Sequence, residues 1–192
     1  AQHPVITGGL AEFQDIGPQR AVAALGVTPG LRVLDFCAGG GGKSLALAAL
    51  GAQVTAHDSA PSRMKDLAKR AARAQAAVRL GLEAGVPPFD LVVCDVPCSG
   101  SGAWRRAVEG KWQLTPEALA GLVELQRSIV AEAAAHLRPG GRLAYMTCSL
   151  LKAENEEQAL YFSERYALQR MYQFTPLDGA DGFFHAEFAA PG

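Results

Sequence analysis

Two of the four cysteines stand at positions where a thiol could act on a substrate. Cys98 lies in "DVPCSGSG" and Cys148 in "TCSLLKAEN", and each follows a short apolar run that is typical of a buried strand. Pro97 favours an extended turn that presents Cys98. If the two strands are parallel neighbours, both thiols meet the carboxylate of Asp95 at one edge of the sheet. Two thiols and a carboxylate that converge on one crevice indicate a site where a substrate base could be gripped.

Other interpretations of the cysteines remain open at this point. A single cysteine is most often a small buried hydrophobe, which is the interpretation that fits Cys94 and, as regards reactivity, Cys37. A disulfide between Cys98 and Cys148 is the competing interpretation. The apolar, strand-like surroundings of all four cysteines favour reduced thiols in a cytoplasmic protein. No histidines stand at ligand spacing, so we expect no metal.

A glycine-rich stretch, "LDFCAGGGGKSLAL" (34–47), could hold a cofactor. A triphosphate loop would need glycine where Cys37 stands, and a dinucleotide fingerprint would need glycine where Ser44 stands. What remains is a strand, an acidic residue (Asp35), a glycine turn and a helix, with Asp58 ending the next strand. This arrangement suits adenosine carried by a sulfonium, although the turn taken alone is equally compatible with a purely structural role.

The apolar pattern predicts strands that alternate with helices. We expect strands at 31–37, 52–58, 89–96, 141–148 and 181–188, the last antiparallel at the edge of the sheet. We expect helices at 43–50, 61–77, 116–137 and 155–166, with "RPGG" (138–141) as the stop of the third. This order predicts one α/β domain whose parallel sheet has helices on both faces.

Composition limits the possible partners. The 192 residues are 49% hydrophobic and have a formal net charge of -1, which is typical of a folded globular chain and not of a polycation. Any nucleic acid must therefore meet a local patch, and Arg105, Arg106 and Lys111 form one with Trp104 and Trp112. We expect Trp112 to pack against the sheet. No apolar run is long enough to span a bilayer, so no membrane contact is expected.

Taken together, these motifs resemble the RNA cytosine-C5 methyltransferase family, of the ribosomal-RNA methyltransferase B and NOL/NOP/Sun type. The resemblance rests on "LDFCAGGGGK", on "DVPCSGSG" followed by "WRR", and on "TCSLLKAEN". "FQDIGPQ" (13–19) is similar to the family's opening helix motif and "DGFF" (181–184) to its closing strand. The resemblance implies a Rossmann-like class I methyltransferase with a mostly parallel seven-stranded sheet. It implies a single catalytic domain over 1–192, without the family's upstream RNA-binding domain, and we expect a monomer.

The resemblance also implies residue roles. S-adenosylmethionine would donate a methyl group to C5 of cytosine in RNA, with ribosomal RNA as the first expectation and transfer RNA as an alternative. Cys148 would be the attacking thiolate, Cys98 would help to release the methylated base, and Asp95 would assist at N3 of the base. The charge of Lys43 could lower the pKa of a nearby thiol. The residues implied around the cofactor are Cys37, Ala38, Gly39, Gly40, Gly41, Gly42, Lys43, Asp58 and Asp95.

Three departures from the family pattern keep alternatives open. Gly40 replaces a proline, which would make the loop more flexible; 78–88 offers only Glu83 where the family has an aspartate; and "AVEG" (107–110) replaces Asn-Pro-Asp. One alternative is a catalytically impaired methyltransferase fold that binds RNA or a protein. Others are a small-molecule or protein methyltransferase, and a DNA cytosine methyltransferase with Cys98 as nucleophile.

Overall fold

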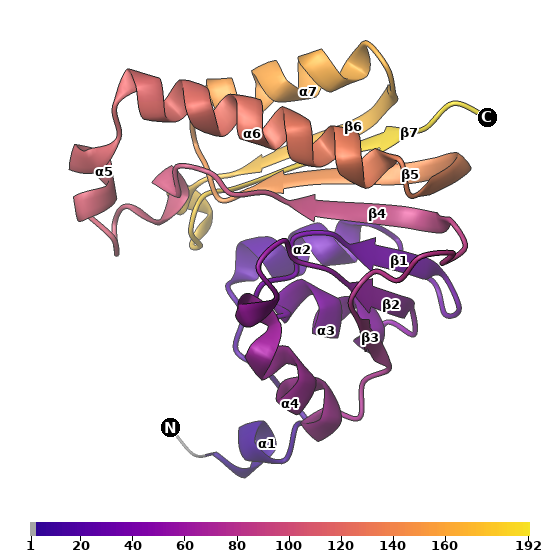
Figure 1. Cartoon of the computed structure of the whole chain (residues 1–192). Helices are drawn as coiled ribbons and strands as arrows, with labels where there is room; N and C mark the ends of the chain where they lie inside the picture. Colours follow the sequence, from indigo (N-terminus) through magenta and orange to yellow (C-terminus); the bar gives the residue numbers. More distant parts are fainter. Residues whose placement is uncertain (1–2) are drawn as a thin grey trace.

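The computed structural model describes residues 3–192 and contains one seven-stranded sheet (Figure 1). The strand order is β3-β2-β1-β4-β5-β7-β6, and only β7 runs antiparallel to its neighbours. The strands are β1 (Arg32–Asp35), β2 (Gln53–Ala56), β3 (Val78–Leu80), β4 (Phe89–Asp95), β5 (Leu137–Thr147), β6 (Ala167–Phe174) and β7 (Phe183–Ala189). The predicted α/β class and the mostly parallel seven-stranded sheet are confirmed.

Helices cover both faces of the sheet, as predicted (Figure 1). One face carries α6 and α7, and the opposite face carries α2 and α3. The helices are α1 (Pro4–Thr7), α2 (Ile16–Ala24), α3 (Gly42–Ala49), α4 (Lys65–Arg73), α5 (Glu109–Gln113), α6 (Pro116–Ala134) and α7 (Glu156–Ser163). Short 3₁₀ turns occupy η1 (Pro61–Met64), η2 (Ser101–Ala103), η3 (Lys152–Glu154) and η4 (Pro176–Asp178). None of the helices within residues 3–192 has the length and apolarity needed to cross a membrane.

Alternation along the central strands explains the two layers of the core. In β4, Val92 and Cys94 face the layer under α6 and α7, whereas Leu91 and Val93 face the layer under α2 and α3. All four side chains are fully buried. A strand that is apolar on both faces must be covered on both, which is why β4 reads as a continuous hydrophobic run.

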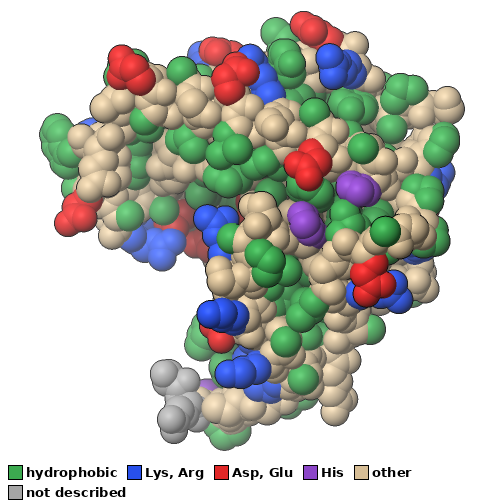
Figure 2. Space-filling model, viewed as in Figure 1, with side chains coloured by type: hydrophobic (Ala, Val, Ile, Leu, Met, Phe, Trp, Pro, Cys, Tyr) green, Lys and Arg blue, Asp and Glu red, His purple; other side chains and the backbone are tan. Residues whose placement is uncertain are grey.

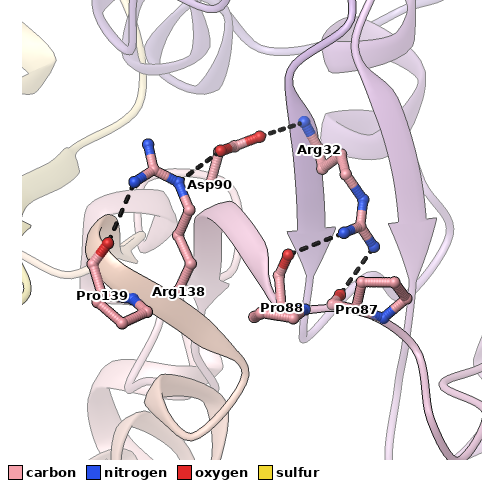
Figure 3. Close-up of polar contacts among 6 residues, drawn as sticks. All are labelled: Arg32, Pro87, Pro88, Asp90, Arg138 and Pro139. Atoms are coloured by element: carbon pink, nitrogen blue, oxygen red, sulfur yellow. Dashed lines mark hydrogen bonds and ion pairs between the residues drawn. The ribbon is translucent and has the colours of Figure 1, made fainter.

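The connection from β3 to β4, residues 81–88, is held by the polar contacts shown in Figure 3. The Arg32 guanidinium donates to the carbonyl oxygens of Pro87 (2.7 Å) and Pro88 (2.9 Å). The Arg32 backbone N–H donates to Asp90 (2.9 Å), whose other oxygen accepts from Arg138 (2.6 Å). These bonds join β1, β4 and β5 at the edge of the sheet opposite the predicted thiols.

Several predicted boundaries are wrong. The helix expected at 116–137 ends at Ala134, and "RPGG" lies inside β5, where the pairing with β4 shifts register between Phe89 and Leu91. The helix expected at 61–77 is a 3₁₀ turn followed by α4, and that expected at 155–166 is the shorter α7. The last strand is antiparallel as predicted, but it is not at the edge, because β6 pairs with its outer side.

Candidate active site

Four parallel strands end at one edge of the sheet, on the left in Figure 1, and the predicted site residues follow them there. The glycine loop follows β1, Asp58 follows β2, the Cys98 loop follows β4 and Cys148 follows β5. Carboxyl ends of parallel strands are where open α/β sheets bind ligands. The structure thus brings the predicted catalytic and cofactor residues to one crevice.

The two thiols meet. The Sγ atoms of Cys98 and Cys148 lie 3.3 Å apart, although the residues are 50 positions apart in the sequence. That separation is a hydrogen bond, since a disulfide would bring the sulfurs to about 2 Å. Both cysteines are free, so the disulfide interpretation is wrong.

The pKa values of the two thiols are shifted in opposite directions. The hydrogen bond from Cys98 lowers the pKa of Cys148, and the charge of Lys43 adds to this, against burial and the charge of Asp95. The same hydrogen bond, followed by burial, raises the pKa of Cys98. Cys148 is also the exposed member of the pair. Since the thiolate is the nucleophile, Cys148 is the thiol better prepared to attack.

The other two cysteines are poor nucleophiles, as predicted. Burial, together with the charges of Asp35 and Asp95, raises the pKa of Cys37 to about 12. Cys94 is fully buried in β4, and burial raises its pKa well above the ordinary value. Both stay protonated near neutral pH, so neither is prepared to attack a substrate.

Lys43 and Asp95 form an ion pair directly beside the thiols. Burial opposes the charge on Lys43, but the charge and hydrogen bond of Asp95 outweigh it, and the pKa of Lys43 is raised. The Lys43 ammonium also lies 5.2 Å from the centre of the Phe183 ring. Lys43 is therefore a fixed cation that orients the Asp95 carboxylate.

The glycine loop is shaped by positive backbone angles and one close approach. Gly39 and Gly41 have φ of 49° and 83°, and a Cβ on Gly41 would lie 2.1 Å from the side chain of Leu67. Ala38 donates its N–H to the His57 carbonyl oxygen at 2.9 Å. The carbonyl oxygen of Gly40, the residue expected to loosen the loop, accepts a hydrogen bond from a surface arginine, Arg70. Gly42 begins α3.

Two buried carboxylates flank this loop. Asp58 accepts from the backbone N–H groups of Gly39 (3.0 Å) and Ala60 (2.9 Å), so it braces the turn. Asp35 accepts from the Ser44 hydroxyl at 2.6 Å through one oxygen, and its other oxygen has no partner among the described residues. Burial raises the pKa of Asp35 to about 6 despite the Ser44 bond. The sequence located Asp35 at the end of its strand but assigned it no role.

A small cavity of about 70 Å³ opens beside this loop. It is lined by Cys37, Asp58 and Pro97 together with residues of the neighbouring strand ends and α6, namely Phe36, His57, Ser59, Arg63, Ile129 and Glu132. The cavity thus lies between the glycine loop and the Cys98 loop.

The predicted RNA-binding residues lie on the segment that leads into α5. Arg105 and Arg106 are exposed, and both guanidinium groups pair with Asp181, a residue that the "DGFF" motif marked without a role. The Lys111 ammonium lies 5.4 Å from the ring of Trp112. The expectation that Trp112 packs against the sheet is wrong, since 79% of it is exposed. The short helix α5 holds this residue away from the core.

The sequence matches one family of known proteins over most of its length. The model of the family described as 16S rRNA methyltransferase RsmB/F matches residues 22–182. The chain belongs to this family. The members of this family are S-adenosylmethionine-dependent RNA cytosine-5 methyltransferases. The predicted family and its cofactor are confirmed.

Relatives and solved structures agree with the family. The ribosomal RNA small subunit methyltransferase B of Erwinia tasmaniensis is 34% identical over 207 residues, and that of Xylella fastidiosa is 34% identical over 176. These matches cover 97% and 86% of this chain but 48% and 41% of the relatives, so the chain spans about half the length of the curated relatives it matches.

Two solved structures superpose closely. The protein PH0851 has a TM-score of 0.88 at 28% identity, covering 97% of this chain and 48% of its own. NSun6 from Pyrococcus horikoshii, determined with SFG, has a TM-score of 0.87 at 21% identity, covering all of this chain and 56% of its own. The second likeness establishes the fold alone.

The residues present fit the family's methyl donor. The free oxygen of Asp35 is a buried acceptor that a bound cationic or hydroxyl-bearing ligand would satisfy. The glycine turn leaves its backbone open to close approach, because nothing lies within 4 Å of the place that a Cβ on Gly39 would occupy. No phosphate-binding sequence is needed for a ligand that carries a sulfonium.

Proposed function

We propose that this chain transfers a methyl group from S-adenosylmethionine to C5 of cytosine in RNA, with Cys148 forming a covalent bond to C6 of the base. The observation that supports this most directly is the thiol pair. Cys148 is exposed, its Sγ lies 3.3 Å from that of Cys98, and the pKa of Cys148 is lowered by that hydrogen bond. Membership of the 16S rRNA methyltransferase family makes ribosomal RNA the first candidate substrate.

The chemistry requires a nucleophile because C5 of cytosine is unreactive by itself. The Cys148 thiolate adds its electron pair to C6, and the displaced π electrons make C5 nucleophilic. The bound cofactor supplies the electrophilic methyl group that C5 attacks. Loss of the C5 proton then restores the double bond as the bond between Cys148 and C6 breaks.

Cys98 is placed to assist the release. As Cys148 bonds to C6, its negative charge is lost, so Cys98 can release its own proton to solvent and, as a thiolate, accept the C5 proton. We therefore assign Cys98 to the elimination step. The opposite assignment, with Cys98 as nucleophile as in DNA cytosine methyltransferases, is opposed by the polarity of the pair, since the pKa of Cys98 is raised by its bond to Cys148.

Asp95 and Lys43 complete the catalytic group. The Asp95 side chain is 31% exposed at the rim and is held by Lys43. The Asp95 carboxylate would accept a hydrogen bond from the N3–H of a base protonated at N3, which favours the addition of the thiolate. The fixed charge of Lys43 also favours the thiolate form of Cys148.

The residues proposed to surround the cofactor lie on the glycine-loop side. Asp58 would accept hydrogen bonds from the ribose hydroxyls, and the free oxygen of Asp35 extends the predicted set. The backbone of the loop would approach the remainder of the ligand. The other members of the set are Cys37, Ala38, Gly39, Gly40, Gly41, Gly42, Lys43 and Asp95.

The RNA would enter through the hollow at the carboxyl edge of the sheet. Figure 2 shows this hollow on the left, between the projecting region of α5 and the lower half of the molecule, with Lys and Arg side chains on both sides. Arg105, Arg106 and Lys111 would contact phosphates, and the exposed ring of Trp112 would stack on an unpaired base. The target base must leave its stack to reach Cys148. The monomeric state, the cytoplasmic location and the single-domain organisation stay predictions.

Labelled S-adenosylmethionine with total RNA tests the proposal. The full chain should label cytosine at C5, and Cys148→Ala should abolish labelling while cofactor affinity, measured by calorimetry, stays unchanged. Labelling of another base, or unchanged labelling by Cys148→Ala, would refute it. Binding of RNA without any labelling would favour the catalytically impaired alternative.

A further inference from the structure

A buried carboxylate joins the two thiol-bearing loops, and the reaction described above does not use it. Glu154 has no exposed surface. Its Oε1 accepts from the Ser99 N–H (2.8 Å) and the Gln126 amide (3.0 Å), and its Oε2 accepts from the hydroxyls of Ser99 (2.5 Å) and Ser149 (2.6 Å). A charge so deeply buried is costly unless it is fully hydrogen-bonded, and here four donors surround it.

The donors include the residues that directly follow the two cysteines. Ser99 follows Cys98 on the loop after β4, and Ser149 follows Cys148 on the loop after β5. Further hydroxyl contacts tie the same loops together, with Ser149 lying 3.3 Å from Ser99 and 3.0 Å from Ser101. One carboxylate therefore fixes the backbone beside both sulfurs.

Hydrogen bonds also fix the backbone at Glu154 and at the residue that follows it. The Tyr145 hydroxyl donates to the Glu154 carbonyl oxygen at 2.7 Å. The next residue, Asn155, accepts from the Thr147 hydroxyl at 2.6 Å and donates to the Ser149 carbonyl oxygen at 2.9 Å and to Gln173 of β6 at 2.9 Å. The carboxylate is thus anchored to β5 and β6 as well as to the loops.

We propose that Glu154 is a positioning residue that sets the separation of the Cys98 and Cys148 sulfurs and so keeps the two thiols in hydrogen-bond contact. This inference rests on the proposed function for its catalytic meaning, but the sulfur geometry can be tested without it. Without the carboxylate, the two loops lose their shared acceptor and the sulfurs separate. The hydrogen bond between Cys98 and Cys148 is then lost.

The chemistry of the four donors predicts which substitution preserves the arrangement. The N–H groups at Oε1 can only donate, whereas the hydroxyls of Ser99 and Ser149 at Oε2 can rotate and accept. In Glu154→Gln, an amide with its oxygen at the Oε1 position keeps all four contacts. Glu154→Ala loses all of them. Glu157→Ala, on the exposed side of α7, is the matched control.

The experiment measures the rate at which iodoacetamide alkylates Cys148 of the full chain against pH, with the modified residue identified by peptide mass. In Glu154→Ala we expect the rate at neutral pH to fall about tenfold, which corresponds to a rise of about one pKa unit. Glu154→Gln should stay within about threefold of the unchanged chain, and Glu157→Ala should match it. Steady-state methylation should show a lower kcat with an unchanged KM for the cofactor.

A folded Glu154→Ala with an unchanged alkylation profile would overturn the inference. If that variant does not fold, the double variant Ser99→Ala, Ser149→Ala, which removes only two hydroxyls, decides instead: a slower alkylation supports the inference and an unchanged one overturns it. If even the unchanged chain methylates no RNA, the proposed function fails, while the alkylation profiles still decide the role of Glu154.

Discussion

The two sides of the site are held by different kinds of contact. The cofactor side, made of the glycine loop 37–42 with Asp35 and Asp58, relies on glycine geometry and on Arg70 at the surface. The thiol side, made of the loops 96–102 and 147–155, relies on a buried polar network around Glu154. Within residues 3–192, one buried oxygen of Asp35 on the cofactor side has no hydrogen-bond partner, whereas both oxygens of Glu154 on the thiol side accept hydrogen bonds.

This difference has a chemical meaning. A free buried acceptor is costly for the empty protein and gains its partner when a ligand binds, so the cofactor side is shaped for binding. The thiols must instead hold one geometry through bond formation and bond breakage, so the thiol side is prepared in advance by its own hydrogen bonds. Substitutions on the cofactor side should therefore weaken cofactor binding, whereas those on the thiol side should lower the reactivity of Cys148.

Breaking the cofactor side should have the largest effect on stability. In Gly41→Ala, the new Cβ must displace Leu67 at a φ of 83°, which we expect to cost about 3 kcal/mol of unfolding free energy and to weaken cofactor binding. Gly26→Ala is the control, because Gly26 also has positive φ but open space around it, and about 1 kcal/mol is expected. Denaturant unfolding measures both; equal losses would contradict the role of Leu67.

Acid should lower the stability of the fold through one buried histidine on β7, the strand that pairs with β5 before Cys148. His185 of β7 is fully buried, and within residues 3–192 neither ring nitrogen has a partner. Burial, with the charge of Arg170, lowers its pKa to about 4. The unfolded chain binds this proton near pH 6.5 and the folded chain near pH 4, so stability falls as the pH drops between these values.

The loss from His185 should reach about 3 kcal/mol near pH 4. It is measured as the difference between the unfolding free energies of the unchanged chain and His185→Phe over this range. Asp35 acts with the opposite sign, because its pKa is raised to about 6, but it is common to both proteins and drops out of the difference. Parallel pH profiles would show that His185 is not buried in the neutral form.

Removing one hydrogen bond on the thiol side should cause an intermediate loss of stability and leave the cofactor side unchanged. Thr147→Val removes the hydroxyl that donates to Asn155 at 2.6 Å and accepts from the Ser149 N–H, leaving buried groups without partners. We expect a loss of about 2 kcal/mol and slower alkylation of Cys148, with unchanged cofactor affinity. A double-mutant cycle with Asn155→Ala isolates the bond, and a coupling energy near zero would refute it.

The smallest effect should come from a substitution on α5, which belongs to neither the cofactor side nor the thiol side. Trp112→Ala should weaken RNA binding about tenfold, since one stacked base is worth about 1–3 kcal/mol, without changing stability. Leu160→Ala, a similarly exposed apolar side chain on α7, is the control. Filter binding at fixed salt measures both, and identical affinities would remove Trp112 from the RNA interface.

The strands at the centre of the sheet were predictable because they are apolar on both faces. Two strands, β3 and β6, were missed. β3 is only three residues long with two of them exposed, and most side chains of β6 are exposed in "ALQRMYQF", which has no clean alternation. The absence of β6 from the prediction also put β7 at the wrong place in the sheet. The exposure of Trp112 was missed because tryptophan side chains are usually largely buried, and nothing in "GKWQL" (110–114) shows that its short helix leaves the core.

The meeting of the thiols was predictable, since parallel strands end at one edge. The role of Glu154 was not predictable, because a glutamate just before a helix is usually exposed to solvent. Its burial and its four hydrogen-bond donors are visible only in the structure. A signal was present in the serines that follow each cysteine, "PCSG" and "TCS". The pairing of Arg105 and Arg106 with Asp181 likewise depends on the close approach of β7 to the Cys98 loop, where Gly182 donates to Gly102 at 3.0 Å.

The central claim is that Cys148 attacks the base and Cys98 releases it. Its most direct test is the mass of the covalent complex that Cys98→Ala forms with RNA and S-adenosylmethionine, with the joined residue mapped by peptide sequencing. We predict a stable adduct at residue 148 that carries one added methyl group. An adduct at Cys98 in Cys148→Ala, with none at residue 148 in Cys98→Ala, would contradict the account.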